Sequence, residues 1–298
     1  MRLSLRSQET VTVSVEERSL RLLTVKGGRV QKWGHVPLEP GLVENGLIRD
    51  PEQVGLALEA LFGEQEVPRR GVITSLTVVG LGSASHIFDL PKMKPSLLEG
   101  AVGREAKGAM AVPVQELYLS HLVIGERGDM QQVYVLGVPR DLVDAHVSAF
   151  QIVGIRPKAM DLKSFALVRA VNQRNAVIAD LENESFHVIV VRDAIPDITR
   201  SAALRREGLD LQQKARRLVE EVIRTIDFYN QRHSDRPLDP SAPVFLTGEL
   251  TAVPSVNKII QAEMGYTVEV PKSPLAYPEA LPLSQFMVNI GLALKKEA

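Results

Sequence analysis

Three predicted strands each end at a glutamate, in loops whose pattern otherwise resembles a phosphate-binding site. The first strand run ends at Glu16 and the second at Glu182, while the third ends in Thr247-Gly248-Glu249. Loops that hold a phosphate commonly place glycine at such positions, because a residue without Cβ lets the backbone approach the ligand. Three carboxylates in these places therefore argue against phosphate binding.

The charge of these carboxylates is a second obstacle. One carboxylate about 4 Å from a phosphate charge is repelled by roughly 4 kcal/mol at an effective dielectric constant near 20. That repulsion corresponds to about a thousandfold loss of affinity. Ser14 also stands where an aspartate would be expected, whereas Asp180 and Gly248 keep the expected residue types. We predict that these degenerate positions bind no nucleotide, catalyse no reaction and hold no metal.

Two other interpretations of the same residues stay open. Asp180 is either a surviving metal-positioning carboxylate or, more simply, a strand-end residue that caps a turn. Ser14 and the three glutamates could form a new acidic site for Mg²⁺ or Ca²⁺, which prefer oxygen ligands. The simpler alternative is that these residues drifted on a solvated rim after the ligand was lost.

The composition excludes several classes of protein. The chain has 298 residues, of which 45% are hydrophobic and 24% charged, with a net charge of −1 and no cysteine. The absence of a basic excess argues against nucleic-acid binding. A chain without cysteine forms no disulfide or thiolate nucleophile, and it fits a reducing cytoplasm. No apolar run is long enough to span a membrane, and the N-terminus lacks a signal-peptide pattern, so we expect a soluble cytoplasmic protein.

Hydrophobic periodicity divides the chain into three stretches. In residues 1–82, alternation predicts a β-meander, followed by a helix that begins at Pro51 with Asp50 as its N-cap and ends at Gly63. A further strand is predicted over residues 72–80. This pattern indicates a first lobe.

The two remaining stretches are also α/β in character. Residues 83–161 predict two helices and an antiparallel strand pair, which together indicate an inserted small subdomain. Residues 162–298 predict a second set of strands and helices, with a long amphipathic helix near residues 211–229. Ser201–Leu209 is short, charged and without a pattern.

Several short stretches along the chain carry a resemblance to a known family: Val36–Asp50, Leu90–Met93, Glu105–Lys107, Val112–Val114, Gly137–Arg140, Ala149–Pro157, Phe245–Gly248 and Val253–Pro254. In this order they resemble the PilM family of the actin-like ATPase superfamily, and the resemblance covers nearly the whole chain. The resemblance implies an α/β, actin-like (ribonuclease H-like) two-lobe fold with an inserted small α/β subdomain. Because the family has a longer element where only Ser201–Leu209 stands, it also implies a reduced second lobe.

The resemblance further implies a function in assembly of the type IV pilus. The expected role is a cytoplasmic scaffold, peripheral to the inner face of the cell membrane through a partner and without insertion of its own. The implied partner is the cytoplasmic N-terminal peptide of a PilN-like inner-membrane protein, with a pilus motor ATPase or platform protein as a further partner. The residues expected to bind the peptide are Leu42, Val43, Ile48, Leu98, Val102 and Ala106.

ATP with Mg²⁺ is the cofactor that the family implies, and the three glutamates make a pseudo-ATPase the preferred interpretation. The alternative is an active actin-like ATPase with a rebuilt site. That alternative needs a lysine or arginine to offset the glutamates, and the loops contain none that is suitable. A cell-division membrane tether would need a C-terminal amphipathic helix, and the tail after Ala293 is too short for one. The cytoplasmic domains of type II secretion proteins are also similar, but they continue into a membrane helix.

Overall fold

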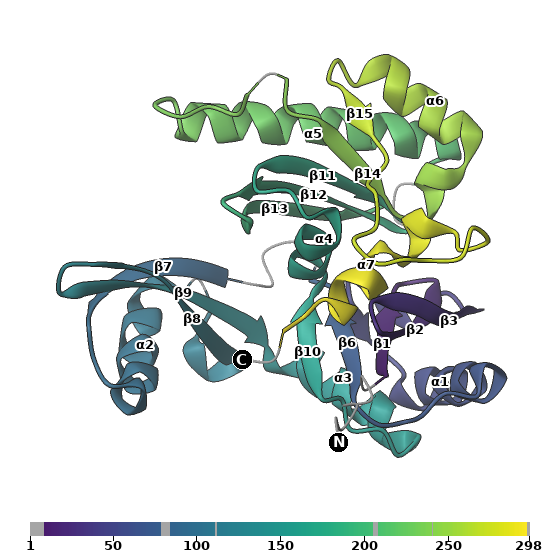
Figure 1. The fold of residues 1–298 in the computed structure, drawn as a ribbon, viewed down its shortest axis with the longest axis horizontal. Helices are drawn as coiled ribbons and strands as arrows, with labels where there is room; N and C mark the ends of the chain where they lie inside the picture. Colours follow the sequence, from purple (N-terminus) through teal and green to yellow (C-terminus); the bar gives the residue numbers. More distant parts are fainter. Residues whose placement is uncertain (1–8, 79–83, 111, 205–207, 240, 297–298) are drawn as a thin grey trace, which may run out of the picture. The chain divides into compact units, whose positions relative to one another are not determined.

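The fold is known from a computed structural model that describes residues 9–78, 84–110, 112–204, 208–239 and 241–296 (Figure 1). The chain forms two compact units: a larger one of Met1–Val79 with Val147–Ala298, and a smaller one of Gly80–His146. Residue 161, where the sequence placed the end of the insert, lies within the larger unit, because β10 (Ala159–Leu162) pairs in parallel with β6 (Val72–Leu76) of the first sheet.

The first sheet of the larger unit has the strand order β10-β6-β1-β2-β3. The predicted meander is its antiparallel part, formed by β1 (Thr10–Val15), β2 (Ser19–Lys26) and β3 (Arg29–Pro37). Gly27 and Gly28 make the β2–β3 turn with φ angles of +60° and +74°, which glycine adopts without strain. A two-stranded hairpin follows, β4 (Val43–Glu44) and β5 (Leu47–Ile48).

Helix α1 (Pro51–Gln65) begins as predicted but ends later. The Asp50 carboxylate accepts a hydrogen bond from the Gln53 N–H at 3.0 Å, so Asp50 is the N-cap. Gly63 lies inside the helix, which ends instead at Glu66 in the left-handed conformation with φ of +49°. Strand β6 stops at Leu76, shorter than the predicted 72–80, and residues 79 and 80 lie outside the described residues.

The second sheet has the order β13-β12-β11-β14-β15. Its strands are β11 (Ala176–Leu181), β12 (Ser185–Arg192), β13 (Ile195–Ala203), β14 (Val244–Thr247) and β15 (Val268–Glu269). Strand β13 was not predicted. It runs into the supposedly unpatterned segment, because Ser201–Ala203 pair with Ser185–His187 of β12. Strand β13 lies at the edge of the sheet, where its partly buried side chains do not alternate clearly.

Helices α4 (Lys163–Val171) and α7 (Leu283–Ala293) pack against both sheets of the larger unit (Figure 1). One core cluster joins them to residues of both sheets, including Leu23 and Ile178. The two helices touch closely at Gly291, where a Cβ would lie 1.8 Å from the Ala166 carbonyl oxygen. This pair of helices therefore forms the apolar layer that both sheets share.

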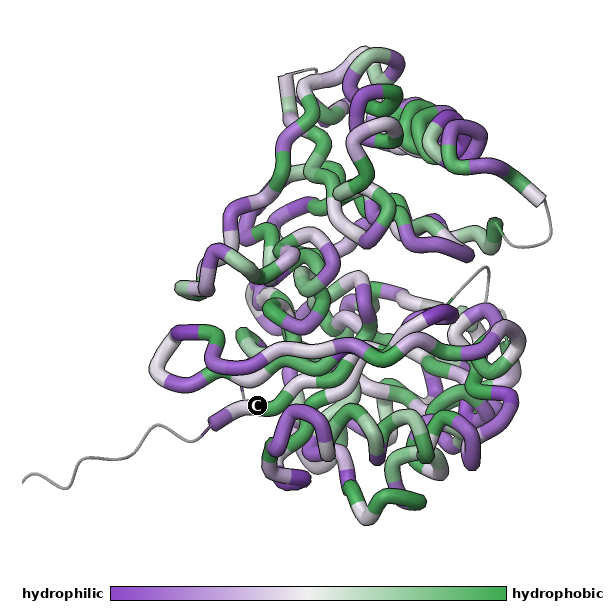
Figure 2. The backbone as a smooth tube through the Cα atoms, turned by 90° about the vertical axis from the view of Figure 1, so that its right-hand side faces the viewer, coloured by the Kyte–Doolittle hydropathy of each residue, from purple (hydrophilic) through white to green (hydrophobic). Residues whose placement is uncertain are grey.

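Helices α5 (Leu211–Arg232) and α6 (Pro254–Glu263) belong to a second core on the second sheet. The buried face of α5 consists of apolar residues at helical spacing, including Ala215, Leu218, Val222, Ile226 and Tyr229. Figure 2 colours this alternation of hydrophobic and hydrophilic residues along the helix. The predicted amphipathic helix is confirmed.

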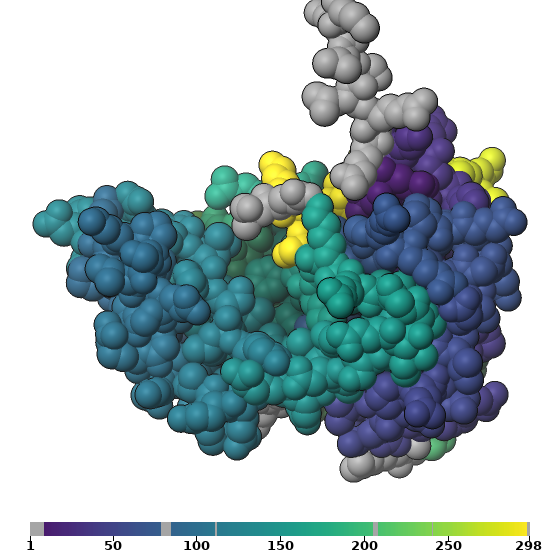
Figure 3. Space-filling view, turned by 90° about the horizontal axis from the view of Figure 1, so that it is seen from below, coloured from purple at the N-terminus to yellow at the C-terminus, as the bar shows by residue number. Residues whose placement is uncertain are grey.

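The smaller unit is a three-stranded sheet of order β7-β9-β8, covered on one face by α2 (Pro95–Ala109). Its strands are β7 (Ala84–Pro91), β8 (Leu117–Arg127) and β9 (Met130–Pro139), and α3 (Arg140–Ile152) follows. The sequence placed no strand at β7, which pairs with β9 along its whole length. In Figure 3 the atoms of this unit, in the blue-teal shades of residues 84–146 at the left, form one contiguous body. Over the described ranges of both units, no helix is both long and apolar enough to cross a membrane.

Candidate functional site

Two hairpins of the larger unit have the same turn. In the β1–β2 turn, the Glu16 N–H donates to the Ser19 carbonyl oxygen at 2.9 Å. In the β11–β12 turn, the Glu182 N–H donates to the Ser185 carbonyl oxygen at 2.9 Å. The two glutamates, both predicted from the sequence as degenerate phosphate positions, therefore occupy equivalent places in the two hairpins.

Strand register extends this equivalence to the neighbouring residues. Ser14 pairs with Arg21 across the first hairpin, and Asp180 pairs with His187 across the second. The first hairpin thus carries a neutral residue opposite a cation, and the second carries an acid opposite an imidazole.

A third loop approaches the second hairpin. The Thr247 hydroxyl donates to the Asp180 Oδ1 at 2.7 Å. Gly248 has a φ of +94°, and a Cβ there would lie 2.4 Å from the Leu181 carbonyl oxygen, so close backbone packing requires glycine. Glu249 follows directly and opens the 3₁₀ turn η3 (Glu249–Ala252).

Arg21 connects these loops. Its guanidinium makes a bidentate contact with Glu182, with Nη1–Oε1 at 2.8 Å and Nη2–Oε2 at 2.6 Å. The same Nη2 donates to Glu249 Oε2 at 3.0 Å, and Nη1 donates to the Gln285 carbonyl oxygen at 3.0 Å. The Arg21 side chain is only 2% exposed. Such paired, charge-assisted bonds fix geometry as well as charge.

Lys163 is the second cation, supplied by the first residue of α4. Its Nζ lies 2.8 Å from Glu16 Oε2, 2.8 Å from Asp180 Oδ2 and 3.8 Å from Glu182 Oε1. Its side chain, like that of Arg21, is 2% exposed. We call the six residues joined in this way the ion cluster: Glu16, Arg21, Lys163, Asp180, Glu182 and Glu249.

The ion cluster has four carboxylates for two cations, and its protonation reflects this excess. Burial, together with the neighbouring carboxylates, raises the pKa of Glu16 from 4.5 to about 7, although Lys163 and Arg21 oppose the shift. Burial alone would lower the pKa of Lys163, but the facing carboxylates raise it above its ordinary value. Burial would likewise lower the pKa of Arg21, but its neighbouring carboxylates raise it above its ordinary value. Both cations therefore stay charged, and Glu16 is the carboxyl group that takes up a proton near neutral pH.

The two partners across the hairpins, Ser14 and His187, stay outside the ion pairing. The Ser14 hydroxyl donates to Asn289 Oδ1 at 3.0 Å, and the Asn289 amide nitrogen donates to the Arg21 carbonyl oxygen at 2.9 Å. His187 Nδ1 lies 2.7 Å from the Ser201 hydroxyl. Burial, assisted by the nearby Lys163, lowers the pKa of His187 well below 6.5, so the imidazole is neutral.

The structure brings most of the predicted site residues together but adds two that the sequence did not identify. Arg21 and Lys163 were missed because they come from a strand and a helix, whereas only the loops were searched for cations. A comparison of the two hairpins could have identified Arg21. It lies five residues after Glu16, just as His187 lies five residues after Glu182. Ser14 faces Asn289 rather than the ion cluster. Among the described residues, no group of three or more acidic, histidine or cysteine residues has the geometry of a metal site.

The residues predicted to bind a partner peptide are mostly buried. Those with buried side chains are Val43, Ile48, Leu98, Val102 and Ala106, each at most 5% exposed. Leu42 is half-buried. The apolar face of α2 packs on its own sheet, while Leu97 on the same helix is 60% exposed. Helical periodicity thus identified a core face, and peptide binding by these six residues stays a prediction.

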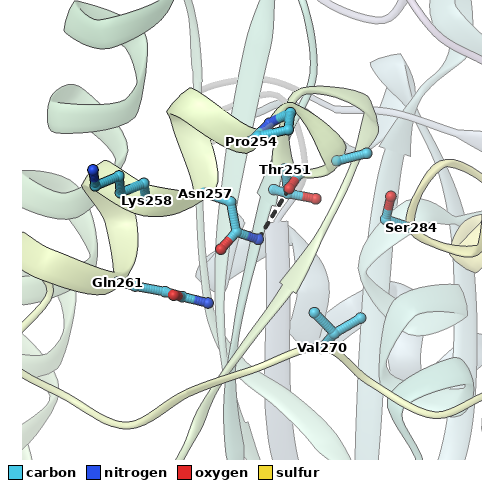
Figure 4. A pocket seen from close by; sticks show the side chains of 8 residues that line it. Thr251, Pro254, Asn257, Lys258, Gln261, Val270 and Ser284 are labelled. Carbon is cyan, nitrogen blue, oxygen red and sulfur yellow. Dashed lines mark hydrogen bonds between the residues drawn. The ribbon is translucent and has the colours of Figure 1, made fainter.

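A pocket of about 440 Å³ lies beside the third loop (Figure 4). One wall is a face of α6 with Pro254, Asn257, Lys258 and Gln261, and the Asn257 amide nitrogen donates to the Thr251 carbonyl oxygen at 3.2 Å. The other lining residues are Thr251, Ala252, Val270 and Ser284. None of them belongs to the ion cluster, so the pocket is a separate feature.

Comparisons with known proteins agree with this architecture. The family described as "Type IV pilus assembly protein PilM" matches residues 12–205. Among solved structures, the chain is similar to the "PilM-PilN type IV pilus biogenesis complex", with a TM-score of 0.76 and 21% identity over 97% of this chain and 98% of that one. No curated protein matches significantly.

More distant structures share the actin-like fold. The ethanolamine utilization protein EutJ from Carboxydothermus hydrogenoformans matches with a TM-score of 0.56 and 12% identity, over 97% of this chain and 90% of that one. The cytoplasmic domain of EpsL, from the type II secretion system of Vibrio cholerae, matches with a TM-score of 0.55 and 11% identity, over 97% of each chain. Since the family match extends over more than half of the sequence, the chain belongs to the PilM family of type IV pilus assembly proteins.

Proposed function

We propose that this chain is a cytoplasmic scaffold of the type IV pilus machine that works without nucleotide. In this role it binds the cytoplasmic N-terminal peptide of a PilN-like inner-membrane protein and is held at the membrane through that partner. Family membership supports the pilus role, and the similarity to a structure of a PilM-PilN complex supports the partner. A motor ATPase or platform protein is the further partner proposed. The ion cluster is the observation that supports a function without nucleotide.

The residues at the three loops do not fit the phosphates of a nucleotide. Arg21 and Lys163, which would be the donors, already bind carboxylates at 2.6–3.0 Å. Glu16 and Glu182 are 3% and 4% exposed, so they cannot turn away into solvent. A phosphate entering the cluster would either displace a carboxylate or remain beside it, at a cost of roughly 4 kcal/mol for each pair of like charges about 4 Å apart.

The alternative, an actin-like ATPase with a rebuilt site, gains one observation from the structure. The cations that this alternative requires do exist, on β2 and α4 rather than in the loops. Both are engaged in buried ion pairs, however, and Arg21 is held bidentately by Glu182. ATP binding would require the carboxylates to release them, so the scaffold remains the preferred function.

The peptide partner should contact exposed side chains rather than the buried ones. An extended peptide gains specificity from apolar side chains that it meets at the surface. Leu97, which is 60% exposed on α2, is available for such a contact, and Leu42 is partly available. We therefore place Leu97 among the peptide contacts.

The experiment is a calorimetric titration with a synthetic peptide of the PilN-like partner's cytoplasmic segment, with and without Mg·ATP. We expect the same dissociation constant in both conditions. Leu97→Asp should weaken binding by about tenfold, because it places a charge in an apolar contact. Leu56→Asp on α1 is the matched control, since Leu56 is also 60% exposed. Failure of the folded wild-type chain to bind the peptide, or binding only with nucleotide, would contradict the proposal.

A further inference from the structure

We propose that the ion cluster fixes the two sheets of the larger unit in one arrangement without any ligand. Two-lobed folds commonly close around a ligand bound between the lobes, and the ligand supplies the contacts that favour closure. Here, Arg21 and Lys163 would supply those contacts from within the chain. The inference rests on the proposed function without nucleotide. It assigns the ion cluster a structural function, which is to hold the two sheets together.

The contacts of the ion cluster run between the two sheets. Arg21 lies on β2 of the first sheet, whereas its partners Glu182 and Glu249 follow β11 and β14 of the second. Lys163 binds Glu16 beside the first sheet and Asp180 on β11 of the second. Each of the two cations therefore takes part in ion pairs that connect the two sheets.

These contacts differ in kind from most of the interface between the sheets. The α4–α7 layer is mainly apolar, and hydrophobic contact is not directional. Its buried Asn289 adds directional hydrogen bonds to Ser14, Thr12 and Arg21 of the first sheet. The bidentate Arg21–Glu182 pair and the Lys163 contacts require particular distances and angles. A displacement of one sheet would leave buried charges without partners, which is costly in a protein interior. The ion cluster thus adds a buried, charged set of directional contacts, beside the backbone hydrogen bonds that join Gly28 and Val30 of the first sheet to Ala276.

A distance measurement between the sheets tests this inference, and the chain suits it because it has no cysteine. Spin labels would be attached to Gln31→Cys on β3 and Thr199→Cys on β13, both exposed positions. Pulsed electron resonance should give one narrow distance distribution for the ligand-free chain, unchanged by Mg·ATP. In the same background, Lys163→Met should broaden the distribution or shift it.

Three further variants separate a specific role from general destabilisation. Lys163→Arg keeps the charge and should keep the narrow distribution. Lys295→Met removes a partly exposed lysine from its ion pair with Asp161 and should also leave the distribution narrow. Lys163→Met should lower Tm by about 10 °C. If it does not fold, the Lys163→Met/Asp180→Asn double variant replaces it, because Asp180 is the carboxylate of the second sheet that Lys163 contacts at 2.8 Å. With one charge of each sign removed, it should fold and still show a broader distribution than wild type.

Two results would overturn the inference. One is a broad or bimodal distribution for the ligand-free wild-type chain that Mg·ATP narrows. The other is a distribution for the folded Lys163→Met chain, or for the double variant, that equals wild type. Loss of peptide binding with a narrow distance distribution would contradict the proposed scaffold function while leaving this inference intact, so the two failures are distinguishable.

Discussion

The β1–β2 and β11–β12 hairpins have the same turn and different charges. Each places a glutamate at the same point, Glu16 in the first and Glu182 in the second. Across the strands, however, the first hairpin has Arg21 where the second has His187, a buried neutral imidazole. The two hairpins are alike in backbone and unlike in the charge they contribute.

This difference determines where each charge finds its partner. The second hairpin has two buried acids, Asp180 and Glu182, while its own arginine, Arg192, lies beside His233 instead. These two acids are therefore paired with Arg21 from the first hairpin and with Lys163 from α4. If each hairpin supplied the cation for its own buried acids, the charges of each sheet would be balanced separately. Here, the buried acids of each sheet are balanced by cations that lie outside that sheet.

The largest effect expected from breaking this arrangement follows removal of Arg21. Arg21→Met should leave Glu182 buried without its main partner and destabilise the fold by about 3–5 kcal/mol. Arg18→Met in the same hairpin is the control. Arg18 is 34% exposed and lies 3.8 Å from Glu184, so its loss should cost about 1 kcal/mol or less. Denaturant unfolding of both variants measures the difference, and equal costs would show that Arg21 is not the connecting residue.

A second prediction concerns pH and Glu16. Its folded-state pKa of about 7 lies above the ordinary value of 4.5, so the folded chain binds this proton more tightly than the unfolded chain. The resulting stabilisation is fully present below pH 4.5 and is lost as the pH rises through 7, a change of about 3 kcal/mol. Glu16→Gln cannot lose a proton, so its stability relative to wild type should rise between pH 5 and pH 8, by about 3 kcal/mol at most.

Unfolding midpoints measured across this range check the prediction. Glu52→Gln, in the exposed first turn of α1, controls for removal of a glutamate elsewhere. A stability difference between Glu16→Gln and wild type that stays constant with pH would show that Glu16 remains ionised in the folded chain.

The smallest effect should follow a change at His187, the counterpart of Arg21. His187→Leu removes one hydrogen bond to Ser201 and no charge, so it should change stability by about 1 kcal/mol. The same unfolding assay compares it with Arg21→Met. A cost for His187→Leu as large as that for Arg21→Met would mean that the two hairpins are energetically equivalent.

Sequence reasoning identified the elements with strong local patterns. The meander, the Asp50 cap and the long amphipathic helix follow from alternation, capping chemistry and helical spacing, all of which act within a few residues. Strands β7, β10 and β13 were missed because pairing with a neighbouring strand defines each of them, and their sequences lack a regular alternation of apolar and polar residues.

The carboxylates of the site could be located from the sequence, but their charge balance could not. Glu16 and Glu182 stand at predicted strand ends, so their positions follow from local sequence. Lys163 comes within 2.8 Å of Glu16 although 147 residues separate them, and Arg21 meets Glu182 across 161 residues. Only the tertiary fold brings these charges together. The residues predicted to bind a partner show a different limit. Apolar periodicity in a helix such as α2 indicates the face that packs on the core, not a binding surface.

The most direct test of the central claim is a calorimetric titration of Mg·ATP into the wild-type chain at neutral pH. If Arg21 and Lys163 are fully engaged by the four carboxylates, no binding should be detected at millimolar nucleotide, and Tm should not rise. Stoichiometric binding with a micromolar dissociation constant would contradict the account, because it would show that the carboxylates release their cations to a phosphate.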